Sequence, residues 1–253
     1  MSRSLNLQGE RITKLETGEY SLTVYNEFAT RSFSNSITQI DISVNFITEL
    51  PKLPDTVLIL NCSDNSISQI SELPRALKRL YCGMNKLTEL PELPETLITL
   101  LCARNNLHSL PTILPPNLKD LECSYNQLQV LPELPKSLEI LECSDNQLQT
   151  LPKLPESLID VKCSNNKLFT LPKLPPKMTR LICNANPLIF IEPLAKKPKY
   201  WVIPVRLNYL HRNHYSYRNR YETYCYLISF LILECRIAPV ILNNEFWWFC
   251  AKF

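Results

Sequence analysis

Cysteine returns along this chain at nearly constant intervals, and the role of these cysteines decides what chemistry the protein can do. Seven of the ten cysteines are separated by steps of 20, 20, 21, 20, 20 and 20 residues and are Cys62, Cys82, Cys102, Cys123, Cys143, Cys163 and Cys183. Thiols in such numbers can form disulfides, hold a metal ion, act as nucleophiles or serve as small apolar side chains. The residues around them help to choose between these roles.

The cysteines belong to a repeat in which other residue types keep the same register. Asparagine stands three residues after each of these seven cysteines, and an aliphatic residue stands two positions before each cysteine. The segment LPxLP separates successive units, so the repeat reads LPxLPxxLxxLxCxxNxLxx. A unit upstream has Ile42 in the cysteine slot, and residues 5–15 fit again with Glu10 in the asparagine slot. Residues 16–36 fit poorly and are either a degenerate unit or an insertion.

This pattern is similar to that of leucine-rich repeat proteins. The short LPxLP form resembles the repeats of bacterial effectors of the invasion plasmid antigen H and Yersinia outer protein M type. It also looks like leucine-rich repeat proteins of giant DNA viruses, which place Cys in this slot. The resemblance implies a fold and a binding role without naming a partner. Residues 191–253 are too few for the large ubiquitin-ligase domain that such effectors often carry, so that activity is not expected here.

The residue pattern predicts a leucine-rich repeat solenoid with short parallel strands on its concave face, an extended, polyproline-like convex side and little helix. Side chains alternate along a strand, so we expect Leu141 and Cys143 to point inward and Glu142 outward. Proline cannot donate a sheet hydrogen bond, which assigns LPxLP to the return segment. The predicted domains are an N-terminal cap with a degenerate repeat at 1–36, leucine-rich repeats at 37–190, and a basic, aromatic-rich C-terminal cap or tail at 191–253.

The stacked cysteines are predicted to be buried and inert. Neighbouring strands lie about 4.8 Å apart, beyond the usual Cβ separation of about 3.5–4.5 Å in disulfides, and a linear column does not converge on zinc as four ligands must. The N-terminus shows no apolar core of a secretory signal, so we expect a reducing, intracellular location. No cofactor and no metal site is predicted, because the spacing of His211, His214, Cys225 and Cys235 matches no standard zinc pattern. No phosphate loop or nucleophile–base set is seen, and we predict that the chain is not an enzyme.

The outward strand positions are the predicted binding surface for an unidentified protein partner. Two groups of residues adjoin there, which we call the apolar–basic cluster (Arg79, Tyr81, Met84, Leu101 and Arg104) and the acidic cluster (Asp120, Glu122, Glu142, Asp145 and Asp160), with Tyr125 at the join. Exposed Tyr, Met, Leu and Arg are typical of interface centres. The alternative is a solvated face with no selected partner.

The C-terminal segment supports a second hypothesis, in which the protein attaches to nucleic acid or a membrane surface through its tail. Residues 196–220 carry seven Lys or Arg and no acidic residue, with Tyr and Trp between them. Single-stranded nucleic-acid binders also combine basic and aromatic residues in this way. The apolar stretch 223–233 is shorter than the ~20 residues that a spanning helix needs, so no transmembrane span is predicted. We expect a monomer.

Overall fold

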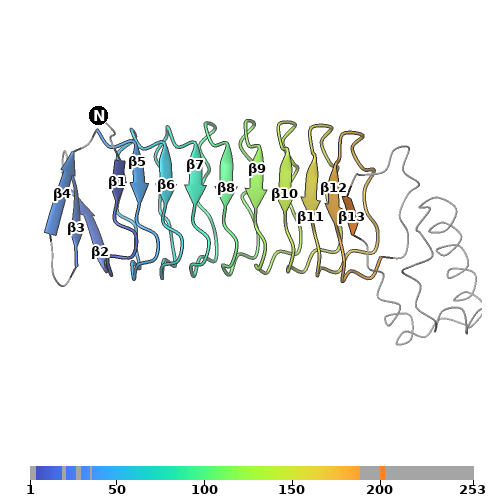
Figure 1. Ribbon diagram of the computed structural model, residues 1–253, viewed down its shortest axis with the longest axis horizontal. Helices are drawn as coiled ribbons and strands as arrows, with labels where there is room; N and C mark the ends of the chain where they lie inside the picture. Colours follow the sequence, from blue (N-terminus) through green and yellow to red (C-terminus); the bar gives the residue numbers. More distant parts are fainter. Residues whose placement is uncertain (1–3, 19–20, 27–29, 35, 189–199, 203–253) are drawn as a thin grey trace, which may run out of the picture. The chain divides into compact units, whose positions relative to one another are not determined.

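A computed structural model of the protein describes residues 4–18, 21–26, 30–34, 36–188 and 200–202. Every regular element in these ranges is a β-strand, and ten of the strands stack into one parallel sheet (Figure 1). In sheet order the strands are β1 (Ser4–Asn6), β5 (Gln39–Asp41), β6 (Ile59–Asn61), β7 (Arg79–Tyr81), β8 (Thr99–Leu101), β9 (Asp120–Glu122), β10 (Ile140–Glu142), β11 (Asp160–Lys162), β12 (Arg180–Ile182) and β13 (Tyr200–Val202). The protein is therefore a parallel-strand solenoid, as the sequence predicted.

Each three-residue strand from β5 to β12 buries its central residue and exposes the two beside it to a greater degree. In β10 the side chain of Leu141 is buried, whereas Ile140 and Glu142 keep partial exposure. Cys143 follows directly after the strand and is also buried, so the predicted inward and outward positions are confirmed. The buried residues of successive turns join into one continuous hydrophobic cluster. A single core of this kind ties every turn to its neighbours.

The LPxLP segments form extended returns, and no helix occurs in those that the structure describes. Their leucines contribute to the core, as Leu131 and Leu151 do with 8% exposure each. A short turn closes each return, for example where the Leu97 N–H donates to the Pro94 carbonyl at 3.0 Å. Proline suits these segments because it needs no sheet partner for its nitrogen. The returns thus carry the chain across the convex side without adding a layer of helices.

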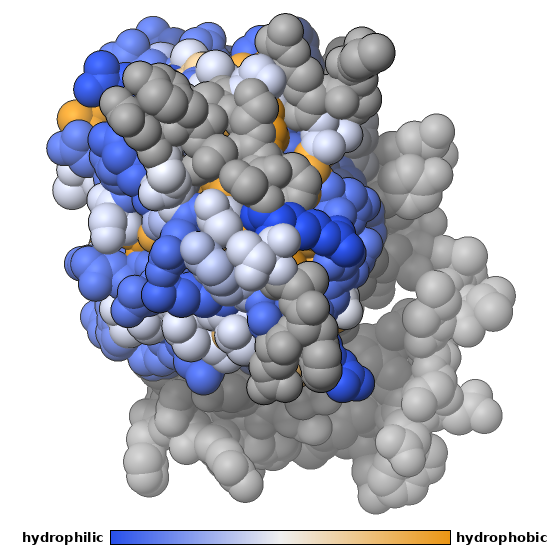
Figure 2. Space-filling view, turned by 90° about the vertical axis from the view of Figure 1, so that its left-hand side faces the viewer, coloured by the Kyte–Doolittle hydropathy of each residue, from blue (hydrophilic) through white to orange (hydrophobic). Residues whose placement is uncertain are grey.

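Residues 14–34 interrupt the solenoid as a small antiparallel sheet. It consists of β2 (Lys14–Thr17), β3 (Ser21–Tyr25) and β4 (Thr30–Ser34), in that order. β1 pairs directly with β5, placing Leu5 beside Ile40, so this sheet is inserted between two turns that stack on each other. Leu22 and Val24 of the insertion are buried in the same cluster as the repeats. Figure 2 views this end, where the described atoms are mainly hydrophilic with scattered hydrophobic ones.

The parallel sheet continues past residue 190, because β13 pairs with β12 and places Trp201 beside Leu181. Most of the predicted basic, aromatic-rich tail lies outside the described residues. The same holds for the histidines and cysteines of the rejected metal set, and for the apolar stretch 223–233. In the described part of the chain, no helix is long and apolar enough to cross a membrane.

Candidate functional site

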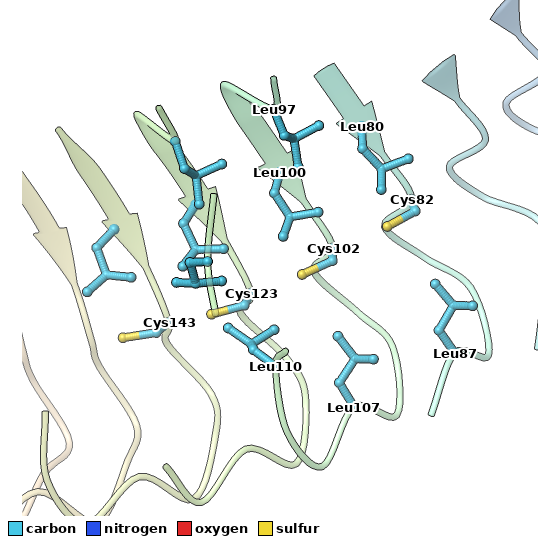
Figure 3. Packing of buried hydrophobic residues seen from close by; sticks show 14 of the residues in the cluster. Leu80, Cys82, Leu87, Leu97, Leu100, Cys102, Leu107, Leu110, Cys123 and Cys143 are labelled. Atoms are coloured by element: carbon cyan, nitrogen blue, oxygen red, sulfur yellow. The ribbon is translucent and has the colours of Figure 1, made fainter. Parts of the chain in front are cut away.

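The cysteines form a column of buried thiols, with one in each of the seven turns from β6 to β12. Figure 3 shows the four labelled thiols stacked along the interior beside leucines: Cys82, Cys102, Cys123 and Cys143. All seven ladder cysteines are free thiols and at most 1% exposed. Burial raises the pKa of Cys62, Cys123 and Cys183 to about 12, and it raises the pKa of the other four as well. Protonated and inaccessible, these side chains match the predicted role of small apolar residues.

The asparagine column holds the turn that follows each strand. The Asn126 amide Nδ2 donates to the carbonyls of Cys102 and Cys123 at 3.1 Å each, and its Oδ1 accepts from the Leu107 N–H at 3.0 Å. The same set of bonds recurs around Asn85 and Asn146. Each asparagine therefore ties its own turn to the one before it. The stacked asparagines thus satisfy buried backbone groups of neighbouring turns.

The residue before each asparagine of this column has a left-handed backbone, and none of these residues is glycine. These residues have φ between 53° and 59° and are Val44, Asp64, Met84, Arg104, Tyr125, Asp145, Asn165 and Ala185. This conformation is unfavourable for most side chains and least so for Asn, Asp and Gly. The chain nevertheless places Met, Arg and Tyr at three successive turns. The side chains of these three residues are exposed. We use the name strand face for the surface formed by the outward positions of β5–β12 together with these left-handed residues.

Sheet register places the predicted residues of the strand face in rows across the turns. The residue after each buried strand centre pairs with its counterpart in the next turn, in the order Tyr81, Leu101, Glu122, Glu142 and Lys162. A second row contains Arg79, Thr99, Asp120, Ile140 and Asp160. Neighbouring strands lie about 4.8 Å apart, so residues adjacent in a row are side-chain neighbours. The structure therefore brings the apolar–basic and acidic clusters together on one face.

The apolar–basic cluster gives a platform with a fixed cation at its edge. Tyr81 and Leu101 are half-buried neighbours, whereas Met84 is 50% exposed. The guanidinium of Arg104 lies over the ring of Tyr125, at 4.3 Å from the ring centroid. Such a cation–π contact orients the arginine and keeps its charge beside an aromatic surface. Arg79, in the second row, is exposed.

The acidic cluster is only partly neutralised by residues of the same face. Lys162 pairs with Glu142, and Arg180 lies 3.7 Å from Asp160. Burial, followed by the charge of Glu142, raises the pKa of Asp120 and of Glu122 above the usual carboxyl values. Burial also raises the pKa of Asp160, although Arg180 and Lys162 oppose it, and Asp160 Oδ1 is buried without a hydrogen-bond partner. The cluster therefore keeps an excess of negative charge in a partly desolvated place.

Lys162 was not among the predicted binding residues, although it belongs to the same row as Glu142. Its position could have been found from register alone, because it occupies the same place in the next repeat unit. In the described part of the chain, no three His, Cys, Asp or Glu side chains are arranged to hold a metal ion. The described residues of the face offer apolar surface and charge.

Comparison with solved structures agrees with this architecture. YopM from Yersinia enterocolitica matches with a TM-score of 0.66 and 35% identity over 68% of this chain. YopM from Yersinia pestis, described as a leucine-rich effector protein, matches with a TM-score of 0.69 and 30% identity over 81% of this chain. The chain is a leucine-rich repeat protein. Its units of about 20 residues and its asparagine column are the features that define the repeat.

The similarity to solved structures covers only part of each chain. The leucine-rich repeat domain of a Shigella effector shares 32% identity over 57% of this chain and 68% of that domain, with a TM-score of 0.46. This chain spans 38% of the Yersinia enterocolitica YopM chain and 54% of the Yersinia pestis one. No family model and no curated protein matches the sequence. The fold implies a protein-interaction module in general terms, and the partner is a separate question.

Proposed function

We propose that this leucine-rich repeat protein is a non-enzymatic module that binds a protein partner through its strand face at β7–β10. The observation that carries the proposal is the set of large side chains at left-handed positions. Met84, Arg104 and Tyr125 have φ of 54°, 57° and 55° and are exposed. Asn, Asp or Gly would fit this backbone at lower cost, as Asp64 and Asn165 do in other turns. Strain kept for exposed side chains is typical of surfaces selected for contact.

The neighbouring positions support the same surface. Tyr81 and Leu101 adjoin Met84 and Arg104 within two turns, so aromatic, aliphatic and basic groups meet over a continuous area. Tyr and Arg are enriched among the residues that dominate binding energy. Repeat solenoids also present their strand side as an extended binding surface. An intracellular location forms part of the proposal, because free thiols in such numbers are typical of reducing compartments.

The proposal is tested by capture with the full chain, followed by a titration. Lysate from the cell that produces the protein is passed over immobilised wild-type chain, and the recovered partner is purified. The Tyr81→Ala/Leu101→Ala variant should keep the fold and bind this partner about tenfold more weakly or worse. The matched control is Ile113→Ala/Val130→Ala, which removes apolar side chains that are 82% and 62% exposed but lie on one return segment and directly before the next.

Unchanged affinity of the Tyr81→Ala/Leu101→Ala variant would contradict the proposed surface. Equal weakening by the return-segment control would do the same, because it would show a contact on the other side. Deletion of residues 196–253 addresses the alternative function. Binding that survives this deletion supports the strand face, whereas binding that is lost assigns the contact to the tail.

A further inference from the structure

The strand face changes from apolar to acidic between β8 and β9, and, given the proposed function on which this inference rests, this change bears on the chemistry of the partner. Leu101 of β8 is the register neighbour of Glu122 of β9, and Glu122 is the neighbour of Glu142 of β10. On the N-terminal side of this step Tyr81 and Leu101 form the apolar platform. On the C-terminal side Asp120 and Glu122 both project from β9, because residues two apart share a face of a strand.

Asp120 and Glu122 have no basic residue paired with them in the part of the chain that the structure describes. The two cations that act on Glu122 are engaged with other groups. Lys162 pairs with Glu142, and the Arg104 guanidinium lies over the Tyr125 ring. Both cations oppose the rise in the pKa of Glu122, yet burial and the charges of Glu142 and Asp120 outweigh them. The fold therefore keeps two half-buried carboxylates whose charge it does not balance.

Carboxylates of this kind reduce the stability of the free protein, because the folded state disfavours their charged form. Asn and Gln at the same places would keep the shape of the surface without that cost. Residues that cost stability and have no partner within the chain are typical of binding surfaces, where the partner supplies the missing charge. A neutral or acidic segment would leave the cost in place or increase it.

We propose that the face over β7–β10 binds an extended segment of the partner that sets an apolar side chain on Tyr81 and Leu101 and a Lys or Arg against Asp120 and Glu122. The absence of a three-residue metal arrangement in the described ranges favours an organic cation over a metal ion. Guanidinium and ammonium groups form short, strong hydrogen bonds with carboxylates.

The spacing of the strands sets the spacing of the two partner residues. The centre of the Tyr81–Leu101 pair lies about one and a half strand separations, or roughly 7 Å, from β9, which carries Asp120 and Glu122. An extended peptide advances about 3.3 Å per residue, so about two residues cover this distance, and residues two apart point to the same side. The partner segment therefore has an apolar residue and a basic residue two positions apart.

Fluorescent peptides test this assignment directly. The probes are four copies of Leu-Ser-Arg-Ser, four copies of Leu-Ser-Glu-Ser and four copies of Ser-Ser-Arg-Ser, titrated by anisotropy against the full chain at low salt. The Leu-Ser-Arg-Ser peptide should bind about tenfold more tightly than either of the others. The Asp120→Asn/Glu122→Gln variant should lose this preference, and its thermal unfolding temperature should be no lower than that of the wild type.

A matched control removes the same number of carboxylates from the return segments, as Glu72→Gln/Glu92→Gln. This variant should keep the preference for Leu-Ser-Arg-Ser. Equal binding of the basic and acidic peptides, or equal loss in the return-segment control, would overturn the assignment. A partner that needs Tyr81 and Leu101 but tolerates Asp120→Asn/Glu122→Gln would also overturn it, while leaving the proposed function in place.

Discussion

At the scale of single residues, the left-handed position before each ladder asparagine shows a conflict between backbone and side chain. Val44 is β-branched and has φ of 59°, a conformation that disfavours such side chains strongly. Asp64 occupies the same place in the next turn with φ of 55° and a side chain that tolerates this backbone better. The two positions therefore form a natural pair for measuring the strain.

We predict that Val44→Asn raises the free energy of unfolding by about 1 kcal/mol, because Asn relieves left-handed strain. The reverse change, Asp64→Val, should lower it by a similar amount. Urea unfolding of the two variants against the wild type measures both effects. Equal stability of all three proteins would show that the backbone adjusts at no cost, and it would also weaken the strain argument for Met84, Arg104 and Tyr125.

At the scale of elements, the solenoid is built from turns, and the asparagine side chains join each turn to the one before it through hydrogen bonds. Removal of the Asn126 side chain leaves the Leu107 N–H and the carbonyls of Cys102 and Cys123 without its bonds. An unsatisfied buried polar group costs about 1–3 kcal/mol. We therefore predict that Asn126→Ala lowers the free energy of unfolding by about 2–4 kcal/mol in a urea titration.

The control for this change is Asn117→Ala, since Asn117 makes an exposed bond of 3.4 Å to the Glu95 carbonyl. Its effect should stay within about 0.5 kcal/mol. Hydrogen exchange gives a second readout, because the Leu107 amide loses its acceptor in Asn126→Ala and should exchange faster. Similar losses in the two variants would mean that the buried asparagine column contributes no more than a surface bond.

The repeat made most of these elements predictable. Leu, Cys and Asn keep one register over seven turns, so the inward positions, the parallel stack and the asparagine bonds follow from their spacing. The antiparallel sheet at 14–34 has no such repetition, and periodicity left open whether residues 16–36 were a unit or an insertion. The left-handed positions were also not predicted. Val, Met, Arg and Tyr stand there instead of Gly, and no residue type marks the turn.

For the molecule as a whole, the strand face could be predicted in outline and not in its charge balance. Register places Tyr81 beside Leu101, as the alternation indicated. The pairing of Lys162 with Glu142 depends on how long side chains bend toward each other, which spacing alone does not settle. The same limit applies to the rise in the pKa of Asp120, because it depends on the burial of the carboxyl group.

This charge balance predicts how stability varies with pH. Burial, together with neighbouring carboxylates, raises the pKa of Asp120, Glu122 and Asp160 in the folded protein. The folded state then binds more protons than the unfolded state between the ordinary carboxyl pKa, about 4, and the raised values. The stability from these three groups is present in full below that ordinary value. It is lost as the pH rises through the raised values.

We therefore predict that the contribution of these three groups to the free energy of unfolding grows as the pH falls from 7 toward about 4. Urea midpoints across this range should follow that trend in the wild type. The Asp120→Asn/Glu122→Gln variant cannot take up the two protons, so its curve should be flatter, and its stability at pH 7 should equal or exceed that of the wild type. The wild-type and variant curves would run parallel if the carboxylates were fully neutralised within the chain, and the charge-based account of the partner would then lose its support.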